Sequence, residues 1–317
     1  MITRWTKPLS RKALARPNFV YYLWKFVANG ARTGRALASA ASFPDVAPLA
    51  RELSTEGIIV RPSSVFLTDE GQRALDVTTA AVLARSRSAD VQQLAAGTAD
   101  GGERQKEFLV HLVDYPRGID PDDPILRVAL DRKLLEIVAA YLGFWPSLYS
   151  IDAWLNYPTP RPPEISQLWH RDPEDLRLVK AFIYLADVNN ECGPFTYVPR
   201  THPFGAETLT AAKLERKKRF EDDRMSRVFP PEAWRVCTGP AHTMILADTL
   251  GYHRGGKPTI GQRILITFTY TSGTPITERP VYVGAMPSWT ASGIQRWAAR
   301  PIVGANGGGS AKVKQRT

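Results

Sequence analysis

The most informative part of this chain is the stretch LWHRDPEDLRLVKAFIYLADVNNECGPFTYVPRTH, residues 168–202. It places His170 and Asp172 two residues apart, and side chains at that spacing leave the same face of an extended strand. A third ligand could come from His253 in the segment GYHRGG. Two histidines and one carboxylate on one side of a metal leave the opposite positions open, which suits a non-haem Fe(II) site. The sequence therefore predicts a metal centre made of these three residues.

The half of the chain beyond Trp145 consists of short β-rich runs divided by Pro, Gly and Asn. Several such strands without intervening helices favour an antiparallel sandwich or jelly roll over a parallel sheet. The predicted strands are Ser150–Leu155, Gln167–Asp172, Leu178–Val188, Phe195–Val198, His242–Ala247 and Arg263–Tyr270.

The first half carries helical spacing of apolar residues, so the predicted class is mainly β with flanking helices (α+β). Helical spacing covers Phe43–Val60, Thr68–Leu83 and Asp123–Leu142, with short strands predicted at Ile58–Val60 and Ser64–Leu67. A mobile loop is expected over 85–105, and a solvated helix or loop over the charged run 213–227.

We expect one jelly-roll domain over residues 45–302, with a helical N-terminal part. A basic, aromatic segment, 1–44, precedes it. The tail 303–317, rich in Gly, Lys and Ser, is expected to be disordered.

The chain has a formal net charge of +10, and every charged residue before Asp45 is Lys or Arg. The aromatic run Phe19–Val27 is too short to span a bilayer but is suited to peripheral membrane contact as a basic helix. Two alternatives are that these aromatics pack on the domain, or that the segment is an organellar presequence. The only cysteines, Cys192 and Cys237, suggest no disulfide framework, so a cytoplasmic setting is expected, with or without membrane association. The oligomeric state is unknown from the sequence.

Arg263 begins the predicted strand RILITFTY, ten residues after His253. A guanidinium is a planar, permanently charged fork that pairs well with a carboxylate. Arg263 is therefore a candidate for the distal end of a dicarboxylate co-substrate.

Three segments together resemble the phytanoyl-CoA dioxygenase-like family of Fe(II)/2-oxoglutarate oxygenases. They are WHRDPED, VKAFIYLADVNNECGPFTYVPRTHP and TLGYHRGGKPTIGQRILITFTY, and the part of the chain matched covers about residues 145–272. The resemblance implies a double-stranded β-helix, a cupin-like jelly roll, that holds iron in the mouth of its barrel. It also implies that His170, Asp172 and His253 bind Fe(II), that Arg263 binds the C5 carboxylate of 2-oxoglutarate, and that Phe182 packs beside this co-substrate.

The activity implied by the resemblance is hydroxylation of a C–H bond with consumption of O2 and release of succinate and CO2. The substrate would be a small molecule or an acyl or lipid-like compound. Relatives that halogenate carbon replace the carboxylate ligand with a small residue, so Asp172 favours hydroxylation, desaturation or ring closure instead.

The sequence departs from the family pattern at two places. Leu265 stands where a Ser or Thr often provides a second contact to the co-substrate carboxylate, so Thr267, Asn156 or Thr259 would have to supply it. Arg200 stands where a Gly is common, which could alter the pocket entrance.

Two other functions stay open. The same ligands could hold zinc in a non-redox cupin-type protein, or the oxygenase could act on nucleic acid. The second is disfavoured because the positive charge is concentrated in the N-terminal segment, and the β-rich half lacks interleaved aromatic and basic residues. Of the other histidines, His242 is rejected as a ligand, since GYHRGG carries the local pattern. Lys180 is expected to be solvated, while Trp169 and Arg171 could line the outer part of the site.

Overall fold

The structure is a computed structural model that describes Leu23, Val27 and residues 42–96, 108–113, 119–214, 219–272 and 286–303. Most of the predicted basic segment 1–44 and nearly all of the predicted tail 303–317 lie outside these residues. Leu23 and Val27 are helical and exposed, at 50% and 67% of their surface. The proposed membrane contact of Phe19–Val27 therefore stays a prediction. None of the helices that the structure describes combines the length and apolar character needed to cross a bilayer.

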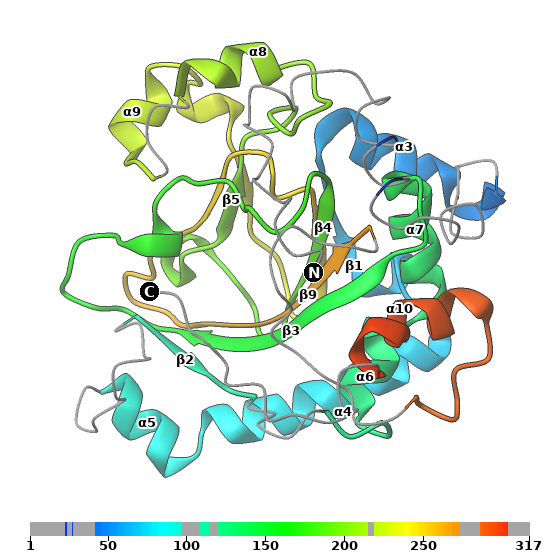
Figure 1. The fold of residues 1–317 in the computed structure, drawn as a ribbon. Helices are drawn as coiled ribbons and strands as arrows, with labels where there is room; N and C mark the ends of the chain where they lie inside the picture. The colour runs from blue at the N-terminus through cyan, green and yellow to red at the C-terminus, as the bar shows by residue number, and fades with distance from the viewer. Residues whose placement is uncertain are drawn as a thin grey trace, which may run out of the picture.

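Two antiparallel sheets form the centre of the molecule (Figure 1). The larger has the strand order β1-β7-β4-β9-β3-β2, and the smaller has the order β6-β5-β8. The strands of the larger sheet are β1 (Ile58–Pro62), β2 (Leu109–His111), β3 (Ser147–Asn156), β4 (Leu178–Tyr184), β7 (Thr243–Ala247) and β9 (Arg263–Thr271). Those of the smaller are β5 (Phe195–Tyr197), β6 (Arg235–Cys237) and β8 (His253–Gly255). The predicted jelly-roll class is confirmed.

Alternation along β4 and β9 gives the larger sheet two different faces. Val179, Ala181 and Ile183 of β4 belong to the main hydrophobic core, to which the helices also contribute. The intervening residues of β4 point to the opposite face, toward the smaller sheet, because successive side chains of a strand leave opposite sides. One face of the sheet is thus packed against helices, and the other is available to line a cavity.

Helices cover the outer side of the larger sheet, where α3, α6, α7 and α10 gather, while α8 and α9 lie apart from them (Figure 1). Their bounds are α3 Ala47–Glu56, α4 Asp69–Ser86, α5 Ala89–Ala95, α6 Pro124–Ala129, α7 Arg132–Leu142, α8 Thr208–Ala211, α9 Asp222–Ser226 and α10 Gly293–Val303. Five short 3-10 turns were not anticipated within the described chain: η4 Pro44–Val46, η6 Ile165–Gln167, η7 Asn190–Cys192, η8 Ala212–Leu214 and η9 Pro231–Ala233.

The single helix predicted over Asp123–Leu142 is two helices. The first ends at Ala129, and Asp131 caps the second, because its carboxylate accepts hydrogen bonds from the backbone N–H of Lys133 at 2.9 Å and of Leu134 at 3.2 Å. An aspartate at an N-cap position favours the start of a new helix over continuation of the preceding one. The same carboxylate accepts a hydrogen bond from Thr68, which caps α4, so one buried acid joins two helix N-termini.

Several other boundaries differ from the expectation. The strand predicted at Ser64–Leu67 is instead the 3-10 turn η5 (Ser63–Val65), and α5 lies inside the predicted loop 85–105. The strand predicted at Gln167–Asp172 reduces to isolated bridges at Trp169 and His170. The charged run 213–227 is not simply solvated, because Leu214, Phe220 and Met225 are buried in a hydrophobic cluster of their own.

Gly57 ends α3 in the left-handed conformation, with φ 75°, and leads directly into β1. A Cβ atom there would lie 2.4 Å from the hydroxyl of Tyr197 and 2.6 Å from Nδ1 of His202. Both side chains are buried, so neither can move freely. In a Gly57→Ala variant, backbone strain at positive φ and steric overlap of the new methyl group with these side chains would therefore both destabilise the folded state.

We expect Gly57→Ala to lower the free energy of unfolding by about 3 kcal/mol. Urea denaturation followed by circular dichroism would measure the change. A loss below about 1 kcal/mol would mean that the Tyr197 and His202 side chains give way to the added methyl group.

Candidate metal and co-substrate site

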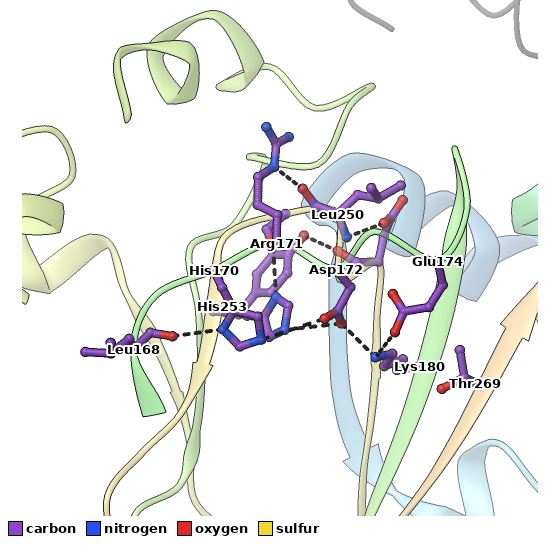
Figure 2. A network of polar contacts seen from close by, with 12 residues as sticks. Leu168, His170, Arg171, Asp172, Glu174, Lys180, Leu250, His253 and Thr269 are labelled. Atoms are coloured by element: carbon purple, nitrogen blue, oxygen red, sulfur yellow. Dashed lines mark hydrogen bonds and ion pairs between the residues drawn. The ribbon is translucent and has the colours of Figure 1, made fainter. Parts of the chain in front are cut away.

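Three side chains from two distant segments converge at one end of the space between the sheets (Figure 2). The ligand atoms of His170, Asp172 and His253 all lie within 4.8 Å of one another. Reciprocal backbone hydrogen bonds join the two histidines: His170 N–H donates to the His253 carbonyl at 2.9 Å, and His253 N–H donates to the His170 carbonyl at 3.1 Å. Asp172 N–H donates to the Thr249 carbonyl at 2.9 Å. Backbone pairing of His170 with the first residue of β8 therefore sets this convergence, although His170 and Asp172 themselves lie outside the regular strands.

Both histidines present Nε2 to the centre of the cluster. Nδ1 of His170 lies 2.8 Å from the Leu168 carbonyl, and Nδ1 of His253 lies 3.0 Å from the Gly251 carbonyl. A carbonyl only accepts, so Nδ1 must carry the proton, and Nε2 of the neutral ring is left with a free lone pair. This backbone contact is the arrangement that orients histidine ligands in metal sites.

Asp172 completes a donor set suited to a divalent metal. Its Oδ1 lies 3.7 Å from Nε2 of His170, and its Oδ2 lies 3.4 Å from Nε2 of His253. Oδ2 is buried and has no hydrogen-bond partner of good geometry among the described residues, although Lys180 forms an ion pair with it. Two imidazole nitrogens and one carboxylate that face a common point fit a metal with open positions on its other side.

Burial and charge keep the groups in the forms that a metal requires. Burial, with a further effect from His253, lowers the pKa of His170 to about 3, so this ring is neutral at physiological pH. Burial opposes ionisation of Asp172, but the charge of Lys180 outweighs it, and the pKa of the carboxyl lies well below its usual value. A neutral imidazole and an ionised carboxylate are the ligand forms that bind metal.

A cavity of about 420 Å³ connects this cluster to Arg263. Its floor is the inner face of the larger sheet, where cross-strand neighbours form successive rows. Asn156 pairs with Arg263 in the first row, and Phe182 pairs with Thr267 four residues further along β9. Lys180 pairs with Thr269 in the last row, roughly 20 Å from Arg263 along the strand.

Arg263 is buried, with 4% of its surface exposed. Its guanidinium donates a hydrogen bond to the Gly256 carbonyl at 3.3 Å, while its Nε atom has no partner among the described residues. No carboxylate of the described chain forms an ion pair with it. An uncompensated buried cation is costly, so this end of the cavity is suited to an anionic ligand.

The structure places the other predicted co-substrate residues as follows. Phe182, Thr267 and Asn156 all line the cavity, and the Phe182 ring lies 4.5 Å from that of Phe195. Thr259 lies outside it, where its hydroxyl contacts the Glu191 carbonyl at 3.3 Å, so it is not a candidate for the second carboxylate contact. Arg200 has a φ of 64°, lies 3.7 Å from Glu56 and is not among the described residues that line the cavity.

The expectation that Lys180 is solvated was wrong. Its ammonium lies in the cavity, 2.8 Å from Oδ2 of Asp172 and 3.0 Å from Oε1 of Glu174 (Figure 2). Burial opposes its charge, but the two carboxylates outweigh burial and raise its pKa above the usual value. Neither Trp169 nor Arg171 lines the cavity; Figure 2 shows Arg171 directed away from the cluster, toward Leu250.

The sequence reasoning also missed Tyr184, Glu174 and Ser150 as lining residues. The two-residue period of β4 could have revealed Tyr184 and Lys180, since both share a face with Phe182. Ser150 could have been found in the same way, because it lies an even number of residues from Asn156 along β3 and therefore shares its face. Glu174 lies in an irregular segment, where no period predicts direction.

The remaining histidines lie outside the cluster, as expected. His242 contacts Thr79 at 3.0 Å, and Nε2 of His202 lies 3.1 Å from the Ser54 carbonyl. His111 lies on β2, where its ring stacks on Trp154 at 4.3 Å.

Comparison with known proteins shows a shared fold. No protein-family model matches the sequence, and no curated protein matches it. The structure of the epimerase SnoN in complex with Fe3+, alpha ketoglutarate and nogalamycin RO matches with a TM-score of 0.51 at 16% identity, covering 78% of this chain and 93% of that one. The alpha ketoglutarate dependent carbocyclase SnoK from nogalamycin biosynthesis matches at 0.47 and 18% identity, covering 78% and 91%. EctD from S. alaskensis with bound Fe matches at 0.45 and 18% identity, covering 74% and 81%.

These identities are low, so the likeness extends to the jelly-roll fold alone. Membership of the phytanoyl-CoA dioxygenase-like family stays a prediction.

Proposed function

We propose that this protein is an Fe(II)/2-oxoglutarate-dependent dioxygenase that hydroxylates a C–H bond of a small organic molecule. The observation that carries the proposal is one cavity with a His-Asp-His cluster and, further along its floor, a buried Arg263 that has no counter-ion among the described residues. A metal site alone would also fit a non-redox cupin. The unpaired guanidinium is what favours a co-substrate with a distal carboxylate.

The role of each residue follows from its position in the cavity. His170, Asp172 and His253 would hold the iron, and Arg263 would pair with the C5 carboxylate of 2-oxoglutarate. Asn156 is the cross-strand neighbour of Arg263. It is therefore better placed than Thr267, which lies four residues further along β9, to make a second contact with that carboxylate.

Bound iron would supply the activation of O2 that is coupled to decarboxylation of 2-oxoglutarate to succinate and CO2. The chain itself would contribute orientation and exclusion of water. Phe182 and Phe195 form an apolar wall between Arg263 and the cluster, and Phe195 also stacks on His253 at 5.6 Å. This wall would keep the co-substrate in one orientation.

The structure of SnoN in complex with Fe3+, alpha ketoglutarate and nogalamycin RO supports a small-molecule substrate, because that protein shares the fold and binds such a compound. The polar residues Ser150, Asp152 and Thr269 at the far end of the floor also favour a substrate with polar groups over a plain acyl chain. We take residues 45–302 as the catalytic domain.

The test is reconstitution of the full chain with Fe(II) under anaerobic conditions, followed by 2-oxoglutarate. We expect a visible charge-transfer absorption on addition of 2-oxoglutarate, and formation of succinate once O2 is admitted. Protein loaded with Zn(II) is the control, since zinc has no redox chemistry. Succinate at the same low level with either metal, and no absorption change, would favour the non-redox cupin alternative.

A further inference from the structure

Lys180 brings a second carboxylate next to the predicted metal ligands. Its ammonium lies 2.8 Å from Oδ2 of Asp172 and 3.0 Å from Oε1 of Glu174. Because both oxygens contact the same nitrogen, they can be no farther apart than the sum of these two distances. Glu174 therefore lies beside the cluster, on the side where Asp172 faces the cavity (Figure 2).

Glu174 has the properties of an additional metal ligand. It follows Asp172 by two residues, it lines the same cavity, and its side chain is 18% exposed. Its second oxygen, Oε2, is buried and has no hydrogen-bond partner among the described residues. Carboxylate oxygens readily join the coordination of divalent metals, so a free Glu174 could take one of the positions opposite the His-Asp-His face.

A fourth protein ligand would impair the proposed activity. The co-substrate must chelate the metal through two atoms, and O2 needs a further position. If Glu174 bound the metal, one of these positions would be filled. The sequence His-x-Asp-x-Glu therefore needs a device that keeps its third member away from the metal.

We propose that Lys180 is a positioning residue that holds Glu174 out of the coordination sphere and fixes the Asp172 carboxylate in place. The inference rests on the proposed iron and 2-oxoglutarate site. Lys180 is well suited to this role because it stands in the middle of the sheet, where pairing with Thr269 on one side and Ala247 on the other fixes its backbone. Its side chain is 15% exposed, so solvent screens the two ion pairs only weakly.

The net charge of the groups around the metal site gives the direction in which loss of Lys180 should change the affinity for metal and for 2-oxoglutarate. Lys180 offsets one of the two negative charges of Asp172 and Glu174. Without Lys180, both carboxylates would face the metal, which raises the local negative charge and attracts a divalent cation more strongly. Loss of Lys180 should therefore leave metal binding at least as tight as in the wild type but weaken binding of 2-oxoglutarate to the metal.

The experiment measures the two affinities separately by calorimetry on the full chain, with Mn(II) alone and then with 2-oxoglutarate added to the Mn(II)-loaded protein. For Lys180→Met we expect Mn(II) affinity equal to or above that of the wild type, and 2-oxoglutarate affinity lower by about tenfold or more. In the double variant Lys180→Met/Glu174→Gln, the competing carboxylate is removed, so 2-oxoglutarate affinity should return to within about threefold of the wild type.

Two further variants complete the design. Lys180→Arg keeps the positive charge and should retain 2-oxoglutarate affinity. Lys180→Gln removes the charge while keeping a hydrogen-bond donor, and it gives the same comparison with the double variant if Lys180→Met does not fold. A purely structural role for Lys180 would lower both affinities together, and Glu174→Gln would not restore either.

The inference is overturned if Lys180→Met binds 2-oxoglutarate as the wild type does, or if the added Glu174→Gln change restores nothing. Failure of the proposed function has a different signature. In that case the wild-type protein itself would bind no 2-oxoglutarate in the presence of Mn(II).

Discussion

Asp172→Ala should lower the affinity of the protein for Fe(II) by more than about 100-fold and abolish metal-dependent formation of succinate. The substitution removes the only carboxylate of the cluster, and the two imidazoles that remain bring no negative charge to the metal. Anaerobic titration with Fe(II) in chloride-free buffer would measure the loss. Chloride is left out because a halide could fill the vacated position.

The fold should survive this change. Lys180 keeps its contact with Glu174, and the backbone bonds of Asp172 and both histidines do not involve the carboxylate. His242→Asn is a matched control, since His242 lies outside the cavity and its φ of 65° is well tolerated by Asn. His253→Ala provides an independent test of the ligand that is distant in sequence. Fe(II) binding at the wild-type level in either ligand variant would refute the assignment.

Arg263→Leu should weaken binding of 2-oxoglutarate by about 100-fold, or about 3 kcal/mol, while leaving metal affinity unchanged. The reason is that a buried guanidinium and a carboxylate form charge-assisted hydrogen bonds that leucine cannot replace. Calorimetry with the Mn(II)-loaded protein would give both affinities. Arg263→Lys should have an intermediate effect, since it retains the charge but not the planar fork.

For Arg263→Leu we also expect a gain in the thermal stability of the ligand-free protein, in contrast to the loss of 2-oxoglutarate binding. Arg263 is buried without an ionic partner in the described chain, so its removal should not destabilise the ligand-free protein and should raise its melting temperature. Thermal denaturation with and without 2-oxoglutarate would separate the two effects. If 2-oxoglutarate affinity is unchanged in Arg263→Leu, another residue must bind the distal carboxylate.

Much of the site could be read from local patterns in the sequence. The spacing of His170 and Asp172, the GYHRGG segment and the β-rich run after Arg263 each predict a feature that the structure contains. The two-residue period along β9 also put Thr267 on the same face as Arg263, where both line the cavity. Local patterns succeed here because side-chain direction in a strand depends only on the residue's place in the alternation.

The errors occurred where contacts join distant segments. Lys180 was expected to be solvated because lysine usually is, and only the pairing of β4 with β9 and β7 places it beside Asp172 and Glu174. In the same way, the break at Asp131 reflects its contact with Thr68, which is 63 residues away along the chain. Whether a residue is buried, and which distant residues it contacts, depends on tertiary packing. The periodicity of the sequence does not reveal either.

The sequence by itself thus determined which residue types are present for metal and carboxylate binding, and which faces of their strands they occupy. Only the tertiary structure decided that His253 pairs with His170 through the backbone, that Arg263 is buried with no counter-ion in the described part of the chain, and that Lys180 lies between two acids. The physical reason is that alternation is a local property of the backbone. Distance and burial depend on how separate strands are paired and packed.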